Sequence, residues 1–343
     1  MARQVEPVSM EDVARRAGVS TATVSRTLRG LPNVSADTRG RVLAAAAELS
    51  YVVSPIASRL ASRRTHTVGV VVPHAARWYF SKVVAGAEEV LREAGLDLLL
   101  YSLGDLSART RFFDQLPLRR RVDAVLTVAM PLTEPEYEAV HTLGVPVVAT
   151  GLRATGTHCV RIDDTGVMLT AVEHLAGLGH RRIGMISTYA DQSMWLPVAH
   201  ERRAGYLAGL AVTGLPVEPD LVVSVPFGVS GGERAMRRLM ERPDPPSAVV
   251  AESDELAFGA VAAARRMGLA VPGDVSVVGI DDHDLSDVMD LTTVRQEVVE
   301  QGVQAGRMIV RAVQHPGEEP RELVLPTSLV VRGSTAPVAG SSP

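Results

Sequence analysis

The sequence predicts an α/β protein: a core of two doubly wound parallel-sheet lobes, preceded by a three-helix helix-turn-helix headpiece. Three observations predict it. Two short helices with a tight turn are expected near the N-terminus, the first 64 residues are basic, and apolar strands alternate with amphipathic helices from residue 66 onward. At 343 residues, the chain is long enough for two or three domains with a large core.

The first element is the segment 8–26, VSMEDVARRAGVSTATVSR, which has the pattern of two helices joined by a turn. Ser9 can cap the first helix with Asp12 as its capping-box partner, and Gly18 can adopt the left-handed conformation that ends it. Ser20 can cap the second helix. The second helix of such a pair is the part that enters a DNA groove, although short helix pairs also occur in ordinary cores.

The distribution of charge favours the DNA-binding interpretation. The whole chain carries a formal charge of −4, whereas residues 1–64 contain ten arginines against five acidic residues. A basic module joined to an acidic body is typical of a DNA-binding headpiece attached to a separate domain. A chance fluctuation in surface charge is the weaker alternative.

A third helix and a linker complete the N-terminal region. Ser35 can cap a helix over 36–49 that covers the first two, so the headpiece is expected to span 1–52. Ser54-Pro55 can open a very short helix through Leu60, which is too short to be stable alone. The segment 53–66 is therefore predicted to be a hinge helix that folds against a partner, or else a plain flexible linker.

The remaining chain has the pattern of two doubly wound lobes. Strands are expected at 68–72, 96–101, 124–128, 145–149, 183–187, 221–225, 248–251, 275–280 and 328–332, and helices at 81–94, 166–178, 199–212, 230–240, 256–267 and 296–314. The core is predicted to span 67–333. Its first lobe takes about 67–161 and 294–325, its second about 162–291 and 326–333, and 334–343 is expected to be a flexible tail. A ligand is expected in the cleft between the lobes, at the carboxyl ends of the strands.

Enzymatic chemistry is not indicated. The sequence has no GxSxG, HExxH, P-loop or GxGxxG motif at the required place, so neither a catalytic residue, a cofactor nor a metal is predicted. Cys159 is the single cysteine and is expected to be a small core residue. Without an apolar run of membrane length or a signal-peptide pattern, the chain is expected to be cytoplasmic.

Several motifs resemble the LacI/GalR family of bacterial transcription regulators. They are EDVARRAGVSTATVSR, THTVGVVVP, DELAFGAVAAARRMGLAVPGDVSVVGIDD, LTTVRQ and LPTSLVVRGST, and their order covers nearly the whole chain. The resemblance implies a repressor that binds a palindromic double-stranded DNA operator as a homodimer. It also implies a periplasmic-binding-protein-like core, whose small-molecule effector, a sugar or related metabolite, controls DNA affinity.

The resemblance assigns roles to positions of this chain. Three residues occupy the base-reading face: Thr21, Ala22 and Arg26. The positions that grip phosphates are Ser9, Thr23, Ser25, Arg29, Ser35, Thr38 and Tyr51. Ala57 and Leu60 match the hinge residues of the minor groove. The effector-binding positions are Arg77, Trp78, Tyr79, Phe80, Arg202, Ser253, Asp254 and Asp281.

Three departures from the family pattern bear on the effector. The segment that commonly reads Asn-Pro-Phe-Phe is here 77–80, Arg-Trp-Tyr-Phe, Ser253 replaces a common Asn, and Gly151 replaces a common Asp. These changes predict an effector with an anionic or aromatic part. In the alternative, Arg77 points to solvent and Trp78 packs in the core.

The functional alternative is a solute-binding protein of a transport system without a DNA role. The basic headpiece disfavours it. The last eleven residues contain no leucine heptads, so a dimer without a coiled-coil tetramerisation tail is expected.

Overall fold

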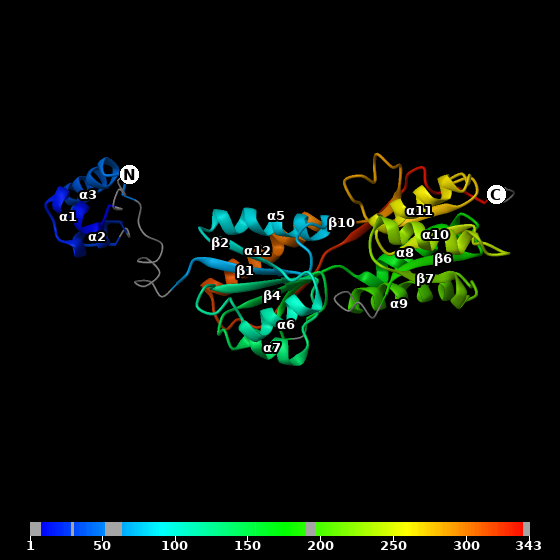
Figure 1. Ribbon diagram of the computed structural model, residues 1–343, viewed down its shortest axis with the longest axis horizontal. Helices are drawn as coiled ribbons and strands as arrows, with labels where there is room; N and C mark the ends of the chain where they lie inside the picture. The colour runs from blue at the N-terminus through cyan, green and yellow to red at the C-terminus, as the bar shows by residue number, and fades with distance from the viewer. Residues whose placement is uncertain (1–7, 29–30, 52–63, 155, 190–195, 339–343) are drawn as a thin grey trace, which may run out of the picture. The chain divides into compact units, whose positions relative to one another are not determined.

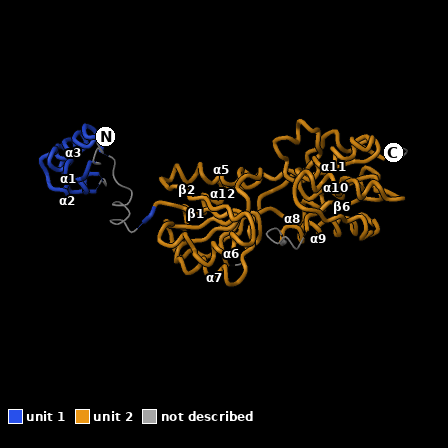
Figure 2. Tube along the Cα trace, viewed as in Figure 1, with its two compact units in different colours: residues 1–65 blue, residues 66–343 orange. Residues whose placement is uncertain are grey.

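The computed structural model describes residues 8–28, 31–51, 64–154, 156–189 and 196–338. The chain divides into two compact units, 1–65 and 66–343 (Figure 2). Three predicted DNA contacts, Arg29, Ala57 and Leu60, lie outside the described residues, and so does the predicted hinge helix.

The described residues of the first unit form three helices with the predicted caps. They are α1 (Met10–Ala17), α2 (Thr21–Leu28) and α3 (Ala36–Glu48). The Ser9 hydroxyl accepts a hydrogen bond from the backbone N–H of Asp12 at 3.2 Å, and the Asp12 carboxylate accepts one from the Ser9 N–H at 3.0 Å. Gly18 ends α1 with φ of 65°. The capping box and the left-handed turn are therefore confirmed.

The helices of the headpiece enclose a small apolar core. Val13, Val24 and Val42, one from each helix, are fully buried. Burying one face of α2 in this core leaves its opposite face exposed. Sequence spacing thus determines which residues of α2 remain on the surface.

The second unit begins with a lobe built on a six-stranded parallel sheet, ordered β11-β5-β4-β3-β1-β2. The strands are β1 (Thr67–Val72), β2 (Asp97–Ser102), β3 (Ala124–Val128), β4 (Val147–Thr150), β5 (His158–Arg161) and β11 (Glu322–Val324). Helices α5 (Trp78–Glu93) and α12 (Val298–Gln314) cover one face, and α6 (Leu106–Gln115) and α7 (Glu134–His141) lie on the other (Figure 1).

The second lobe repeats this design with a sheet ordered β12-β10-β9-β8-β6-β7, in which only β12 is antiparallel to its neighbour. Its strands are β6 (Ile183–Thr188), β7 (Val222–Val225), β8 (Ala248–Ala251), β9 (Ser276–Asp281), β10 (Thr292–Gln296) and β12 (Thr327–Val330). The helices α8 (Asp164–Gly177), α9 (Leu196–Val212), the 3-10 turn η2 (Pro219–Leu221), α10 (Val229–Met240) and α11 (Asp254–Arg266) complete the lobe.

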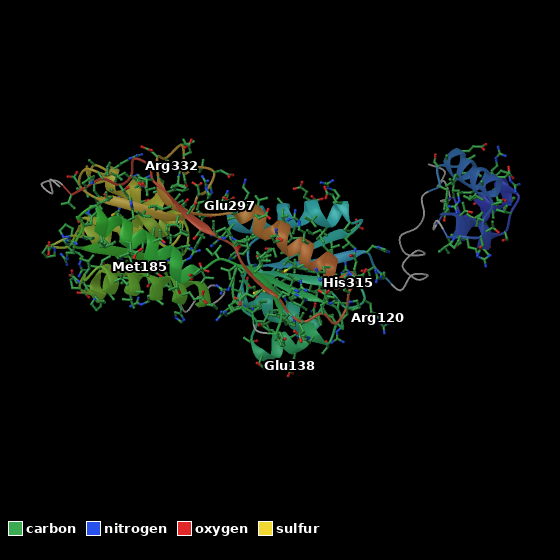
Figure 3. The ribbon with its side chains drawn as sticks, turned by 180° about the vertical axis from the view of Figure 1, so that it is seen from behind. Arg120, Glu138, Met185, Glu297, His315 and Arg332 are labelled. Atoms are coloured by element: carbon green, nitrogen blue, oxygen red, sulfur yellow. The ribbon has the colours of Figure 1, made fainter. Side chains whose placement is uncertain are left out.

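The chain passes between the lobes three times: after β5, after β10 and after β11. Figure 3 shows Glu138 on the first lobe, Met185 within the second, and Glu297 at one of the passages. A cleft with three connecting segments keeps the two sets of strand ends facing each other, which is where doubly wound folds bind ligands.

Two predicted boundaries differ from the structure. The first lobe was expected to resume at 294, but β10 pairs with β9 and β12 and so belongs to the second sheet through Gln296. The tail expected from 334 is bound to the second lobe, because Ser334 donates a hydrogen bond to the Val277 carbonyl at 2.6 Å and the N–H of Val338 bonds the Leu178 carbonyl at 3.1 Å. No helix among the described residues is long and apolar enough to cross a membrane.

Candidate functional site

A cavity lies between the lobes of the second unit, at the carboxyl ends of strands from both sheets. Ala129 and Gly151 follow β3 and β4, while Glu252 follows β8 and Asp281 ends β9. Its volume is about 60 Å³. This is far below the roughly 300–1,000 Å³ of typical ligand pockets, so the cleft of this structure is closed.

An arginine and a carboxylate form the buried centre of the cavity. Arg202 of α9 donates from Nε to Asp164 Oδ1 at 2.8 Å and from Nη1 to the carbonyl oxygen of Glu252. The Asp164 and Arg202 side chains are 3% and 9% exposed. Burial raises the pKa of Asp164 although Arg202 opposes that shift. The pairing offsets the cost of burying two charges, and it leaves Arg202 aimed into the cleft.

A second carboxyl group faces Arg202 from the end of β9. Asp281 Oδ1 accepts a hydrogen bond from Gln296 Nε2 at 2.5 Å, and the residue has a φ of 125°. Burial, partly opposed by Arg202, raises the pKa of Asp281 to about 8. Around neutral pH, its carboxyl group is therefore largely protonated and able to donate as well as accept hydrogen bonds.

Aromatic and charged side chains at the start of α5 reach the second lobe. Arg77 lies over the Phe227 ring, with 4.4 Å between Cζ and the ring centroid. The rings of Trp78 and His283 lie 4.7 Å apart between centroids. One turn further along α5, the Nζ of Lys82 lies 2.8 Å from Asp284 Oδ2. These contacts hold the cleft closed at the α5 side.

Tyr79 occupies the space next to Gly151. A Cβ at Gly151 would lie 3.1 Å from the Ala129 Cβ and 3.2 Å from Tyr79 Cζ, and closer still to the Tyr79 hydroxyl. That hydroxyl donates to Gln301 Oε1 at 2.9 Å. In this structure, the tyrosine ring therefore fills the place that a side chain at 151 would occupy.

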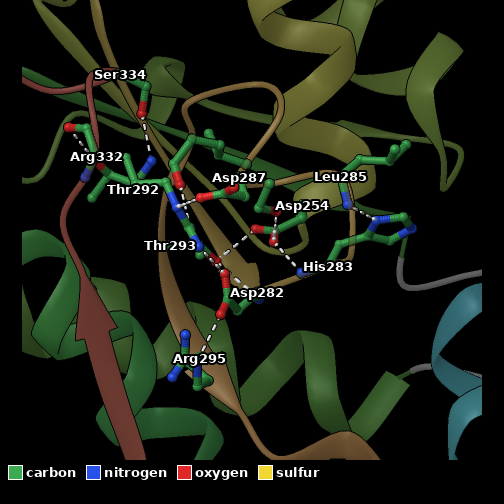
Figure 4. A network of polar contacts seen from close by, with 12 residues as sticks. Asp254, Asp282, His283, Leu285, Asp287, Thr292, Thr293, Arg295, Arg332 and Ser334 are labelled. Carbon is green, nitrogen blue, oxygen red and sulfur yellow. Dashed lines mark hydrogen bonds and ion pairs between the residues drawn. The ribbon is translucent and has the colours of Figure 1, made fainter.

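Seven of the eight predicted effector residues line this cavity, and Arg77 and Trp78 are among them. The expectation for Asp254 is wrong. Its carboxylate accepts hydrogen bonds from Thr293 Oγ1 at 2.7 Å, Ser286 Oγ at 2.6 Å and the N–H of His283 at 2.8 Å (Figure 4). Asp254 is fully buried and fastens the 282–291 loop and the start of β10 to α11.

Six further polar or aromatic residues line the cavity without having been predicted: Asp164, Thr188, Phe227, Glu252, Glu255 and Gln296. Each stands at or just beyond the end of a strand or the start of a helix. The alternation of strands and helices in the sequence could have indicated these positions, since the carboxyl ends of parallel strands share one edge of a sheet. Which of those side chains face the cleft depends on how the lobes meet.

In the headpiece, the three predicted base-reading residues, Thr21, Ala22 and Arg26, are exposed on α2. Hydroxyls assigned to phosphates take part in caps: Ser9 caps α1, and Ser35 accepts from the backbone N–H of Thr38 at 3.3 Å. A cap residue lies at a helix N-terminus, where backbone donors also favour an anion. The headpiece therefore exposes the predicted base-reading side chains on one face of α2, and it exposes helix N-termini that carry hydroxyl groups.

Two family descriptions match the chain over these same regions. Residues 9–54 match the bacterial regulatory proteins of the lacI family, and residues 172–335 match a periplasmic-binding-protein-like domain. Two relatives align almost throughout. The transcriptional repressor CytR of Escherichia coli is 32% identical over 97% of this chain and 98% of its own, and the regulator AglR of Rhizobium meliloti is 32% identical over 98% and 97%.

Solved structures show the same architecture. A Lac repressor dimer bound to operator and the anti-inducer ONPF superposes with a TM-score of 0.85 at 27% identity, covering 96% of this chain and 100% of that one. The regulator CelR in complex with cellobiose gives a TM-score of 0.71 at 33% identity, covering 95% and 99%. The fold and site thus define a ligand-controlled DNA-binding regulator. The chain belongs to the LacI family of bacterial transcriptional regulators.

Proposed function

We propose that this protein is a cytoplasmic repressor that binds a palindromic operator as a homodimer and is controlled by an uncharged, hydroxyl-rich effector of the sugar or glycoside class. The observation that carries the effector class is the composition of the interlobe cavity. It combines carboxyl groups, a glutamine and a serine with aromatic rings. Polar groups of this kind can hydrogen-bond hydroxyls, while the rings can stack on the apolar face of a sugar.

The charges of the cavity disfavour the anionic effector that Arg77 suggested. Four carboxyl residues line it, Asp164, Glu252, Glu255 and Asp281, and even without the largely protonated Asp281 they outnumber the two arginines. Arg202 is paired with Asp164, and Arg77 lies over Phe227 and attracts Glu255, an interaction that counteracts the burial-raised pKa of that carboxyl group. An added anion would meet surplus carboxyl groups. The aromatic part of the prediction remains, with Trp78, Tyr79 and Phe227 as its contacts.

Calorimetric titration of the full chain tests the effector class. Neutral mono- and disaccharides and aryl glycosides are compared with the corresponding sugar phosphates. Binding of neutral compounds, weakened more than tenfold in Arg202→Met, supports the proposal. Binding of the phosphates alone would refute it and restore the anionic hypothesis.

For the DNA side, we propose that Thr21, Ala22 and Arg26 read bases in the major groove. Ser9, Thr23, Ser25, Arg29, Ser35, Thr38 and Tyr51 are proposed to hold phosphates, and Ala57 and Leu60 to contact the minor groove. Support comes from the exposed face of α2 and from the match of residues 9–54 to the lacI family. A bidentate contact of arginine with a guanine is worth about 1–3 kcal/mol.

The DNA proposal is tested by selecting bound sequences from a random library and measuring their affinity by mobility shift at several salt concentrations. Arg26→Ala should weaken the selected operator roughly tenfold or more and relax the preference at one base pair of each half-site. Arg203→Ala, an equal charge change on the exposed surface of α9, is the control and should leave affinity unchanged. A uniform loss for all DNA sequences in Arg26→Ala would contradict base reading by Arg26.

A further inference from the structure

The first lobe contains a second cavity, of about 510 Å³, which is much larger than the closed interlobe cavity. Its floor is formed by side chains of β3 and β4, and its walls by α7 and the segment that follows β4. Residues that define it are Thr127, Met130, Tyr137, Ala149, Leu152 and Thr157. A volume of this size falls in the range of small-molecule binding sites.

The connection between β4 and β5 explains why this cavity exists. The two strands are parallel neighbours, and parallel neighbours are usually joined through a helix that covers one face of the sheet. Here the connection runs only from 151 to 157 and contains no helix among its described residues. This face of the sheet is therefore left open beside α7. In a regular doubly wound sheet, a covering helix fills the same space.

The lining combines apolar surface with threonine hydroxyl groups. Thr127 and Thr157 both line the cavity, and these residues are 3% and 9% exposed. Tyr137 and His141 of α7 form a ring pair with 4.2 Å between centroids. Such a lining suits an apolar ring that carries one or two hydrogen-bonding groups.

Charge in the cavity is nearly balanced. Arg153 and Glu134 are exposed lining residues, and the Nε of Arg153 lies 3.4 Å from Glu322 Oε1. An ionised ligand would gain little from this arrangement while losing its hydration. The lining therefore favours an uncharged ligand.

Consecutive residues line the two cavities at three places. Ala129 lines the interlobe cavity and the next residue, Met130, lines the second one. After β4, Gly151 lines the interlobe cavity and Leu152 lines the second one. On α9, Val198 lines the interlobe cavity and Pro197 lines the second one. A ligand in either cavity would thus contact residues bonded directly to residues that line the other.

We propose that this cavity is a second small-molecule site, which takes an uncharged aromatic molecule bearing a hydroxyl or similar group and which is coupled to the effector cavity through the shared strand ends. The coupling, though not the binding, rests on the proposed function.

Isothermal titration of the full-length protein with 2-naphthol tests the site. Two variants carry the same substitution, one in each cavity: Ala149→Leu fills the second cavity, and Ala199→Leu fills the interlobe cavity. We expect 2-naphthol to bind wild type and Ala199→Leu alike, and Ala149→Leu at least tenfold more weakly. Thr127→Val, which removes a hydroxyl with little change of volume, should weaken binding about three- to tenfold, and circular dichroism checks that each variant is folded.

Three results would overturn the site: no saturable binding to wild type, loss of binding only in Ala199→Leu, or equal weak binding to all variants. For the coupling, operator affinity is measured by mobility shift with saturating 2-naphthol. We expect at least a threefold change in wild type that Ala149→Leu lacks; no change in wild type would overturn the coupling. Because calorimetry does not depend on DNA, a failure of the site is distinguishable from a failure of operator binding.

Discussion

Gly151 offers the most direct test of how the first lobe shapes the effector cavity. The perturbation is Gly151→Ala. Gly151 has a φ of 78°, and an added Cβ would lie 3.1 Å from the Ala129 Cβ and even closer to the Tyr79 hydroxyl. The substitution therefore imposes two separate costs: a strained backbone conformation and a steric conflict with the tyrosine.

The two costs can be separated by a matched control. Gly268 has the same φ of 78°, but a Cβ there meets nothing within 4 Å. Gly268→Ala should thus cost only the left-handed conformation, about 1–2 kcal/mol. Gly151→Ala should cost that amount plus about 1 kcal/mol for displacing Tyr79 from its 2.9 Å hydrogen bond to Gln301, so about 2–3 kcal/mol in all.

The assay is urea unfolding of each purified variant, followed by far-UV circular dichroism. Tyr79→Phe removes the clashing hydroxyl, so Gly151→Ala should cost about 1 kcal/mol less in the Tyr79→Phe background than in wild type. Equal losses for Gly151→Ala and Gly268→Ala, with no rescue by Tyr79→Phe, would refute the idea that the tyrosine fills the place of a side chain at 151.

Three further predictions concern the buried centre and the headpiece. Arg202→Met should destabilise the protein by about 3–5 kcal/mol in urea unfolding, because it leaves the Asp164 carboxyl buried without its partner; Arg202→Met/Asp164→Leu should recover much of this loss, and no recovery would argue against the pair. Burial raises the pKa of Asp281 to about 8, above its ordinary value, so its contribution to stability is complete at acidic pH and falls as the pH rises toward 8. The melting temperature of Asp281→Asn should therefore decline less between pH 6 and pH 9 than that of wild type, and parallel declines would contradict the shift. Ser9→Ala should destabilise a headpiece fragment by about 1 kcal/mol through loss of the cap to Asp12, measured by thermal circular dichroism; Ser9→Asp, which keeps a cap acceptor, should lose much less.

Local patterns were enough for the elements whose signals are short-range. The caps at Ser9 and Ser35 and the left-handed turn at Gly18 follow from side-chain chemistry within three or four residues. Strands buried on both faces, such as β1 and β6, are continuous apolar runs that need no knowledge of their neighbours. Short elements and elements of mixed composition were not predicted from the sequence. β10 reads TTVRQ, in which polar residues occupy buried positions, and α6 reads LSARTRFFDQ, in which only Arg109 and Phe112 are buried, so neither shows a clear apolar pattern.

The sequence by itself determined the class of protein, the order of its longer elements and seven of the residues that line the interlobe cavity. Only the tertiary structure decided what those residues do there. Asp254 is held by Thr293 and Ser286, so it fastens a loop, and the Tyr79 ring fills the place of a side chain at 151. Such pairings join residues far apart in the chain, and a local pattern carries no information about which distant side chain will meet a given carboxyl group or glycine. The second cavity has the same origin, since a missing helix becomes visible only when the sheet is assembled.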